Sequence, residues 1–175
     1  MNLEQAVFEL IDMRSFSNLW YWIALAVVWS SASHWVLGVP FDMVQRARRY
    51  GGEAETDLED MVRINCNRFS YIFRVAGLWL VAFVCFVLTG LAYLGFIFGV
   101  EFAQAVFLIG FPLAIVGLMS LGTVNRIQNE ALAGEALRHR MIRHRIYVQM
   151  LGVISIFITA LWGMYQNLTT GAIGG

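Results

Sequence analysis

One histidine stands inside a long stretch without charged side chains. His34 lies in residues 15–41, which contain no Asp, Glu, Lys or Arg, and Ser30 and Ser31 precede it by one helical turn. An imidazole in an apolar helix can relay protons or bind a metal, or it can stay neutral and bond to a serine or carbonyl of a facing helix. The structural role is favoured, because no other uncharged run of this length contains a His, Asp or Glu as a second ligand.

Polar side chains recur at helical spacing just before the second uncharged run. Arg63, Asn67, Ser70 and Arg74 are separated by four, three and four residues, which places them on one side of a helix. Such a stripe can bind an anionic ligand or a lipid head group at a membrane surface. It can also be a solvated face whose arginines extend toward water, and the spacing alone favours this second interpretation.

The densest group of basic side chains comes just before the fourth uncharged run. Arg138, Arg140, Arg143 and Arg145 fall within eight residues, together with two histidines. An arginine near an anionic membrane surface contributes about 1 kcal/mol to binding. We therefore expect these four arginines to contact anionic lipids or a partner protein, and also to fix the orientation of the helix that follows.

Several classes of site are not indicated. Cys66 and Cys85 lack the spacing of a metal site or a redox pair and are expected to be reduced thiols that pack as small apolar groups. The chain has no nucleotide-binding loop and no pair of histidines on one uncharged run. Twelve acidic residues balance twelve arginines, so no net field attracts nucleic acid. The residues predict no catalytic site, no metal site and no cofactor.

Composition and charge spacing predict an integral membrane protein. Hydrophobic residues make up 59% of the 175 residues and charged residues 14%, against about 25% charged residues in a soluble domain. Uncharged runs cover residues 15–41, 75–100, 102–125 and 146–175, and each exceeds the roughly 20 residues that cross a bilayer as a helix. The prediction is a single all-α membrane domain, 1–175, built as a four-helix bundle with spans near 17–39, 75–98, 103–124 and 147–166.

Arginine placement predicts the orientation of these spans. Eleven of the twelve arginines lie in the two loops 42–74 and 126–145, and one lies in the N-terminal segment. Loops rich in arginine stay in the cytoplasm. Both termini are therefore expected on the outer, periplasmic side, with helical extensions of the spans in the cytoplasm.

Local signals refine the helices. Gly95 and Gly99 with Glu101 predict the turn between the second and third spans. Thr56 and Glu59 fit a capping box, and the absence of Pro and Gly from residues 57–76 predicts one continuous rod into the second span. Further expectations are a break at Gly134, ordinary packing around Pro112, and an N-terminal helix over residues 1–16 lying in the outer interface.

Two family resemblances bear on function. Residues 10–44, whose middle reads Asn18-Leu-Trp-Tyr-Trp-Ile-Ala-Leu-Ala-Val-Val-Trp-Ser-Ser-Ala-Ser-His34, resemble a family of small four-helix bacterial inner-membrane proteins, some labelled a component of the iron–sulfur assembly complex SufBCD. That resemblance implies a bacterial inner membrane. Arg63, Asn67 and Arg68 resemble the stripe of the four-helix glutathione-using membrane enzymes, although Tyr71 stands near the place of that family's glutamate.

The sequence favours a non-enzymatic role. Small size and spans without carboxylates indicate an accessory or structural subunit of a larger inner-membrane complex. One alternative is a membrane-embedded glutathione-type transferase or isomerase with an anionic thiol cofactor over Arg63 and Asn67. A second is a small carrier that uses His34. The expected partners are anionic membrane lipids and either other membrane subunits or further copies of the chain, with no nucleic acid.

Overall fold

The computed structural model describes residues 15–173 and the side chains of residues 15–168, so the predicted N-terminal interfacial helix lies outside the described residues. The described chain is all-α apart from one small hairpin, which confirms the all-α part of the predicted fold class. The elements are the short 3-10 turn η1 (Ser15–Ser17), α2 (Leu19–His34), β1 (Trp35–Val36), β2 (Val39–Pro40), α3 (Phe41–Tyr50), α4 (Gly52–Ala92), the π-helical turn η2 (Tyr93–Ile97), α5 (Glu101–Asn129) and α6 (Gly134–Ile173).

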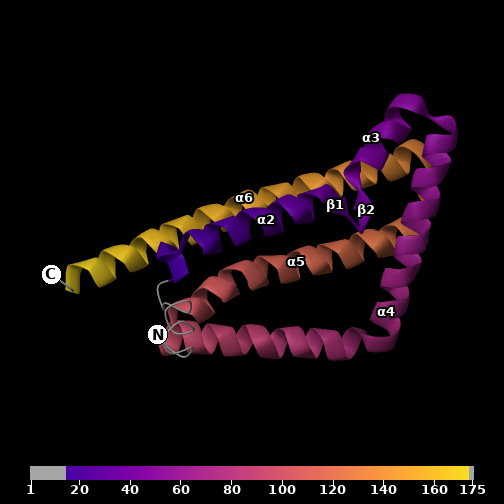
Figure 1. Ribbon diagram of the computed structural model, residues 1–175. Helices are drawn as coiled ribbons and strands as arrows, with labels where there is room; N and C mark the ends of the chain where they lie inside the picture. The colour runs from indigo at the N-terminus through magenta and orange to yellow at the C-terminus, as the bar shows by residue number, and fades with distance from the viewer. Residues whose placement is uncertain (1–14, 174–175) are drawn as a thin grey trace, which may run out of the picture.

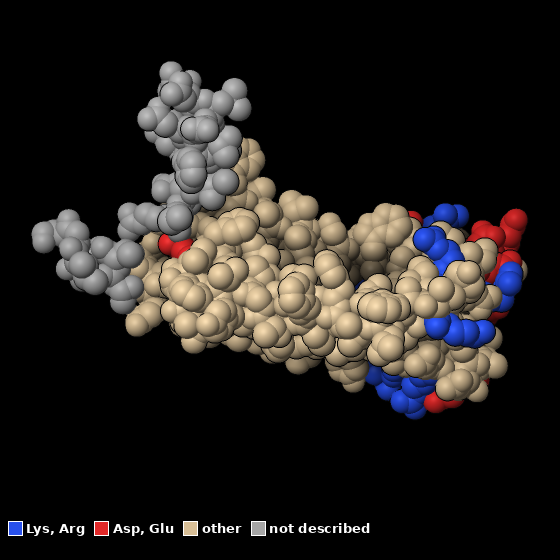
Figure 2. Space-filling model, turned by 90° about the horizontal axis from the view of Figure 1, so that it is seen from below, with Lys and Arg blue, Asp and Glu red and all other residues tan. Residues whose placement is uncertain are grey.

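The molecule has a long body and a head at one end (Figure 1). The body consists of α2, α5, most of α6 and the second half of α4. The head consists of the hairpin, α3, the first half of α4 and the adjoining ends of α5 and α6. Charged side chains gather over the head, whereas the visible face of the body carries almost none (Figure 2).

Three helices are long and apolar enough to cross a membrane. They lie within Gly52–Ile97, Glu101–Asn129 and Gly134–Leu168. The first predicted span, 17–39, is not among them: its α-helix is α2, whose 16 residues extend about 24 Å at 1.5 Å per residue. That is shorter than a hydrocarbon core of about 30 Å. The predicted helix to residue 39 was therefore wrong at its end.

A tight hairpin ends this first helix. β1 and β2 pair in antiparallel fashion, and the turn between them holds Leu37 at φ 55° and Gly38 at φ 74°. Two successive residues with positive φ form the turn type that suits the twist of a two-residue hairpin. Pro40 also keeps the residue before it extended. The hairpin redirects the chain into α3 and places Val36 and Val39 in the head core.

The second predicted span does begin as a long extension. α4 is one helix of 41 residues, which confirms the continuous rod. It is not straight, however. Figure 1 shows that α4 bends near its middle, so that its first half crosses the ends of the other helices and its second half runs along the body. Leu58, Val62 and Cys66, spaced four residues apart, face the head core and hold the first half there.

The predicted capping box was wrong. α4 already begins at Gly52, after Gly51 at φ 59°, and the Thr56 hydroxyl donates to Gly52 O. Glu59 instead accepts a hydrogen bond of 2.6 Å from the backbone N–H of Gly134. It therefore caps the start of α6, a helix far away in sequence, where a carboxylate also complements the helix dipole. The break predicted at Gly134 is confirmed, with φ 55° at that residue.

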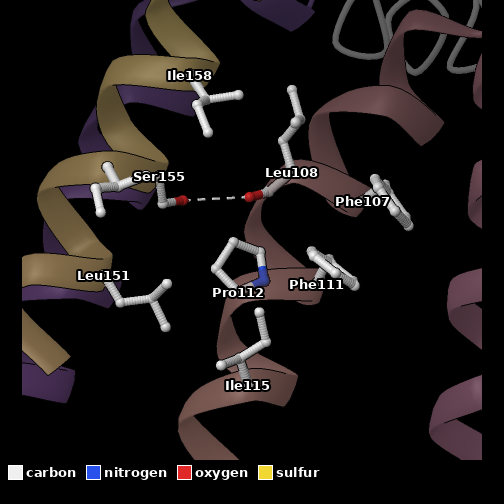
Figure 3. Close-up of a pocket in the computed structure, with 9 residues that line it drawn as sticks. Phe107, Leu108, Phe111, Pro112, Ile115, Leu151, Ser155 and Ile158 are labelled. Carbon is white, nitrogen blue, oxygen red and sulfur yellow. Dashed lines mark hydrogen bonds between the residues drawn. The ribbon is translucent and has the colours of Figure 1, made fainter. Parts of the chain in front are cut away.

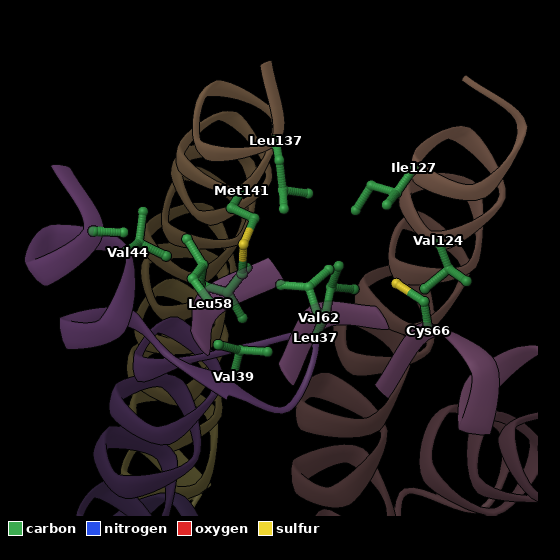
Figure 4. Close-up of a cluster of buried hydrophobic side chains, with 12 residues drawn as sticks. Leu37, Val39, Val44, Leu58, Val62, Cys66, Val124, Ile127, Leu137 and Met141 are labelled. Atoms are coloured by element: carbon green, nitrogen blue, oxygen red, sulfur yellow. The ribbon is translucent and has the colours of Figure 1, made fainter. Parts of the chain in front are cut away.

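Burial of aliphatic side chains holds the head together. Twelve residues from five elements form one buried cluster: Val36, Leu37, Val39, Val44, Ala47, Leu58, Val62, Cys66, Val124, Ile127, Leu137 and Met141. Figure 4 shows these side chains converging from the hairpin, α3, α4, α5 and α6. Complete burial of one such aliphatic side chain contributes about 1.5–3 kcal/mol. Burial also raises the pKa of the Cys66 thiol to about 11, which keeps it protonated at neutral pH.

Candidate functional site

A buried histidine joins α5 to α6 beside the head. Nδ1 of His144 lies 3.1 Å from the Thr123 hydroxyl, and Nε2 lies 3.4 Å from the Ser120 hydroxyl. Ser120 already donates to the backbone oxygen of Val116 at 2.8 Å, so it can only accept from the ring. The ring proton is therefore on Nε2, and Nδ1 accepts from Thr123. Sequence reasoning missed this group, because its partners become neighbours only through tertiary packing.

The environment of His144 favours the neutral imidazole. His144 precedes the fourth predicted span. Burial, and then the positive charge of Arg140, lower its pKa from the ordinary value of 6.5. A second ring proton would sit on Nδ1 and displace the hydrogen that Thr123 donates. The site thus suits a neutral structural link better than a proton carrier at neutral pH.

Acidification is expected to destabilise the protein through His144. Below about pH 6.5 the unfolded chain binds a proton that the folded chain resists, so the free energy of unfolding falls until pH reaches the lowered pKa of the folded state. Unfolding measured in detergent between pH 5 and 7.5 should show this slope in the wild type and a reduced slope in His144→Asn. An equal slope in His144→Asn would contradict the assignment.

Two of the four arginines of the predicted lipid cluster have partners inside the protein. Arg138 pairs with Glu55 of α4, with 19% and 31% of the two side chains exposed. Arg145 donates from Nε to Ser33 O at 3.1 Å, and its guanidinium carbon lies 3.8 Å from the centroid of the Phe41 ring. These contacts tie the start of α6 to the rest of the head, a role the sequence did not indicate.

The other two arginines of the cluster are differently placed. Arg143 is exposed. Arg140 is half-buried, and its Nε is buried without a hydrogen-bond partner in the described structure. The contact of all four with anionic lipid stays a prediction. Arg143 is the most exposed of the four.

The predicted anion stripe divides into separate contacts. Asn67 and Ser70 both meet Gln128 of α5, which donates to Asn67 Oδ1 at 3.2 Å and accepts from the Ser70 hydroxyl at 2.7 Å. Arg63 pairs with Asp60 one turn earlier on the exposed surface. Arg74 is exposed. The middle of the stripe therefore joins α4 to α5, and the helical spacing alone could not reveal Gln128 as its partner.

His34 does not face the interior of the bundle, which corrects the sequence-based expectation. It is the last residue of α2 and is exposed, as are Ser30 and Ser31. Its ring meets the Trp35 ring edge to face at 5.8 Å between centroids. The inner face of α2 is occupied by Leu25 and Trp29 instead. Among residues 15–168 there is also no group of three His, Cys, Asp or Glu side chains able to hold a metal.

A second polar centre, also unforeseen, lies at the end of the body away from the head. The buried Gln104 donates to Gly95 O at 2.7 Å and accepts from the Trp162 indole at 3.0 Å and from Gln166 at 2.6 Å. It therefore links η2 and α6 to α5. Gly95 allows this approach, because a Cβ at residue 95 would lie 2.9 Å from the backbone nitrogen of Gln104. The turn predicted near Gly95–Glu101 is confirmed, and the hydrogen bonds of Gln104 hold it in place.

Pro112 is accommodated by a neighbouring helix. A proline has no N–H, so the carbonyl four residues earlier, that of Leu108, loses its helical donor. The Ser155 hydroxyl of α6 donates to this carbonyl at 3.4 Å, beside a small apolar cavity of about 240 Å³ (Figure 3). Membrane helices tolerate proline when a neighbouring side chain supplies a hydrogen bond to the carbonyl that has lost its donor.

The Ser155 contact is expected to show coupling with Pro112. Ser155→Ala should lower stability by about 0.6 kcal/mol, an average for interhelical hydrogen bonds in membrane proteins. In a Pro112→Ala background the new backbone N–H of residue 112 donates to Leu108 O, so Ser155→Ala should leave the free energy of unfolding almost unchanged. Unfolding of the four variants in detergent measures this difference. Equal costs in both backgrounds would show that the serine does not serve the freed carbonyl.

An open apolar groove separates α4 from α5 along the body. It measures about 600 Å³ and lies between residues 69–88 of α4 and residues 110–121 of α5. Phe69, Phe73 and Phe111 contribute rings to it, and Cys85 lies along its wall with an exposed side chain. The groove is larger than the cavity beside Pro112 and is the more open candidate for a binding surface.

Comparison of the chain with protein-family models, curated proteins and solved structures gives no match. The family resemblances seen in residues 10–44 and around Asn67 therefore stay predictions. Function has to be inferred from the polar links, the arginines and the groove described above.

Proposed function

We propose that the protein is a non-enzymatic accessory subunit of a larger complex in a bacterial inner membrane. One observation carries the proposal. Only 6% of the most apolar 18-residue window of α4 is buried inside the protein, against 11% for α5 and 28% for α6. A membrane-crossing helix gains little from contact with lipid alone, so its specific contacts come from close packing and hydrogen bonds with other helices. The exposed half of α4 offers such a surface to a partner.

The polar side chains support a structural rather than a catalytic role. His144 is bonded to Ser120 and Thr123, and Arg138 is paired with Glu55. These groups hold helices together and leave no nucleophile and base facing a shared cavity within the described residues. In the proposed membrane arrangement, Arg143 contacts anionic head groups and supplements the orientation given by the other arginines.

In the proposed topology four segments cross the membrane, with the head in the cytoplasm and both termini in the periplasm. The short α2 crosses with the help of its neighbours, because α2 packs against α6 through Leu25, Trp29 and Val148. A phosphatase active only outside the cytoplasm should be active when fused after residue 175 and inactive when fused after residue 52. The opposite result at either position would contradict this topology.

Recovery of a partner tests the accessory role. Gly90 lies on the exposed part of α4, and a Cβ added there meets nothing within 4 Å, so a helix of another protein could approach closely. We expect purification in mild detergent to recover a stoichiometric membrane partner. Gly90→Leu should reduce recovery at least tenfold, and Gly122→Leu, at an equally open site on α5, should not.

Other outcomes of the same purification would replace the proposal. A self-assembled trimer with bound thiol would support the glutathione-type alternative. A monomer that retains full function in the cell would exclude an accessory role through α4.

A further inference from the structure

The groove between α4 and α5 has a basic end. Arg68 and Arg74 flank Phe69 and Phe73, whose rings line the groove where it meets the head. Both arginines are exposed, and the described structure gives neither an ion pair. The chain has no acidic residue between Asp60 and Glu101. The end of the groove beside the head therefore carries uncompensated positive charge, and the rest is apolar.

The lining of the groove favours an acyl chain. Its α5 wall, residues 110–121, is about 16 Å long at 1.5 Å per residue. Every residue that lines the groove is apolar, from Phe69 and Phe73 beside the head to Leu88 and Gly110 at the other end. An apolar groove with positive charge at one end matches a molecule that has an apolar tail and an anionic head group.

We propose that this groove holds an acyl chain of a phospholipid whose anionic head group contacts Arg68 and Arg74. The planar donors of arginine suit phosphate oxygens. This inference rests on the proposed membrane location but not on the proposed protein partner.

Native mass spectrometry of the full chain in mild detergent tests the inference, with phosphatidylglycerol and phosphatidylcholine of identical acyl chains as ligands. Phosphatidylglycerol should bind more tightly. The Arg68→Gln/Arg74→Gln variant, which lacks two arginines, should bind phosphatidylglycerol roughly 30-fold more weakly than the wild type. The control Arg48→Gln/Arg49→Gln removes the same charge from exposed positions of α3 and should change the affinity for phosphatidylglycerol less than threefold.

A second pair of variants tests the acyl site. Gly117 lines the groove, and a Cβ there meets nothing within 4 Å, so Gly117→Phe should fill the groove and abolish retention of both lipids. Gly122→Phe, five residues further along α5 and outside the groove lining, is its control. Equal retention in Gly117→Phe, or equal binding of glycerol phosphate without acyl chains, would overturn the proposal. A change of oligomeric state with unchanged lipid would instead make the groove an interface between copies.

Cysteine labelling gives a measurement on the wild-type protein, which keeps the test decisive if a variant fails to fold. Cys85 is exposed and lines the groove, whereas Cys66 is buried in the head. Saturating phosphatidylglycerol should slow alkylation of Cys85 by a maleimide at least fivefold, and phosphatidylcholine should slow it less. An alkylation rate that phosphatidylglycerol leaves unchanged would show that no acyl chain occupies the groove.

Discussion

Met141→Ala is expected to lower the free energy of unfolding by about 2–5 kcal/mol, the range for removal of a fully buried methionine side chain. Met141 has 0% of its surface exposed and lies where α6 meets the hairpin, α3 and α4. Its loss leaves a cavity that five elements would have to close together. The head segments are joined by tight connections, among them Gly51 and the Leu37–Gly38 turn, which restrict such a collapse.

The matched control for this prediction is Met150→Ala on the same helix. Met150 is 57% exposed, so its truncation should change stability by less than about 0.5 kcal/mol. Thermal or denaturant unfolding in one detergent, followed by circular dichroism, compares the two variants with the wild type. If both variants lower the free energy of unfolding by the same amount, the head is not a packed core and the arrangement of α3 over α6 would be wrong.

The long elements could be predicted because charge alone marks them. Uncharged runs of this length form helices in an apolar solvent, since a helix satisfies its own backbone groups. The turn near Gly95–Glu101 was also predictable, because one helix between Arg74 and Arg126 would be roughly 75 Å long, more than a bilayer can hold. The break at Gly134 was predictable because this residue is the only glycine in residues 126–145. These signals are local, and they do not depend on how the helices pack.

The end of α2 and the start of α4 were not predicted correctly. A window of apolar residues cannot tell a helix from a buried hairpin, and the signal that could have done so is Gly38 with Pro40 at the end of the run. At Thr56 the sequence matched a capping box, but the helix had already begun at Gly52, directly after the positive φ of Gly51. Glu59 was then free to cap α6.

The polar links of the fold depend on tertiary neighbours, so the sequence could indicate only some of their members. Arg138 was predicted as a membrane contact and is paired with Glu55. His144 was grouped with surface arginines and is buried between helices. The predictable feature was that arginines gather at one end, and the structure confirms this in Figure 2. Which of them face solvent is decided by the bend of α4 and by the hairpin.

Gly152→Leu is expected to separate α2 from α6. A Cβ at residue 152 would lie 2.8 Å from the ring of Trp29, an aromatic side chain that is only 6% exposed. Overpacking of this kind costs about 1–3 kcal/mol where the neighbours can shift, and more where they cannot. Trp29 is confined by Leu25 and Val148, so its ring has little room to move away from an added side chain.

Removal of the opposing ring distinguishes overpacking from a general intolerance to leucine. Trp29→Ala leaves a space into which a leucine at residue 152 can extend, so Trp29→Ala/Gly152→Leu should be more stable than the sum of the two single changes by about 1 kcal/mol or more. Gly122→Leu, where an added Cβ meets nothing within 4 Å, should change stability little. Strict additivity in this cycle would mean that the two residues do not touch, and α2 would then have to lie elsewhere on the body.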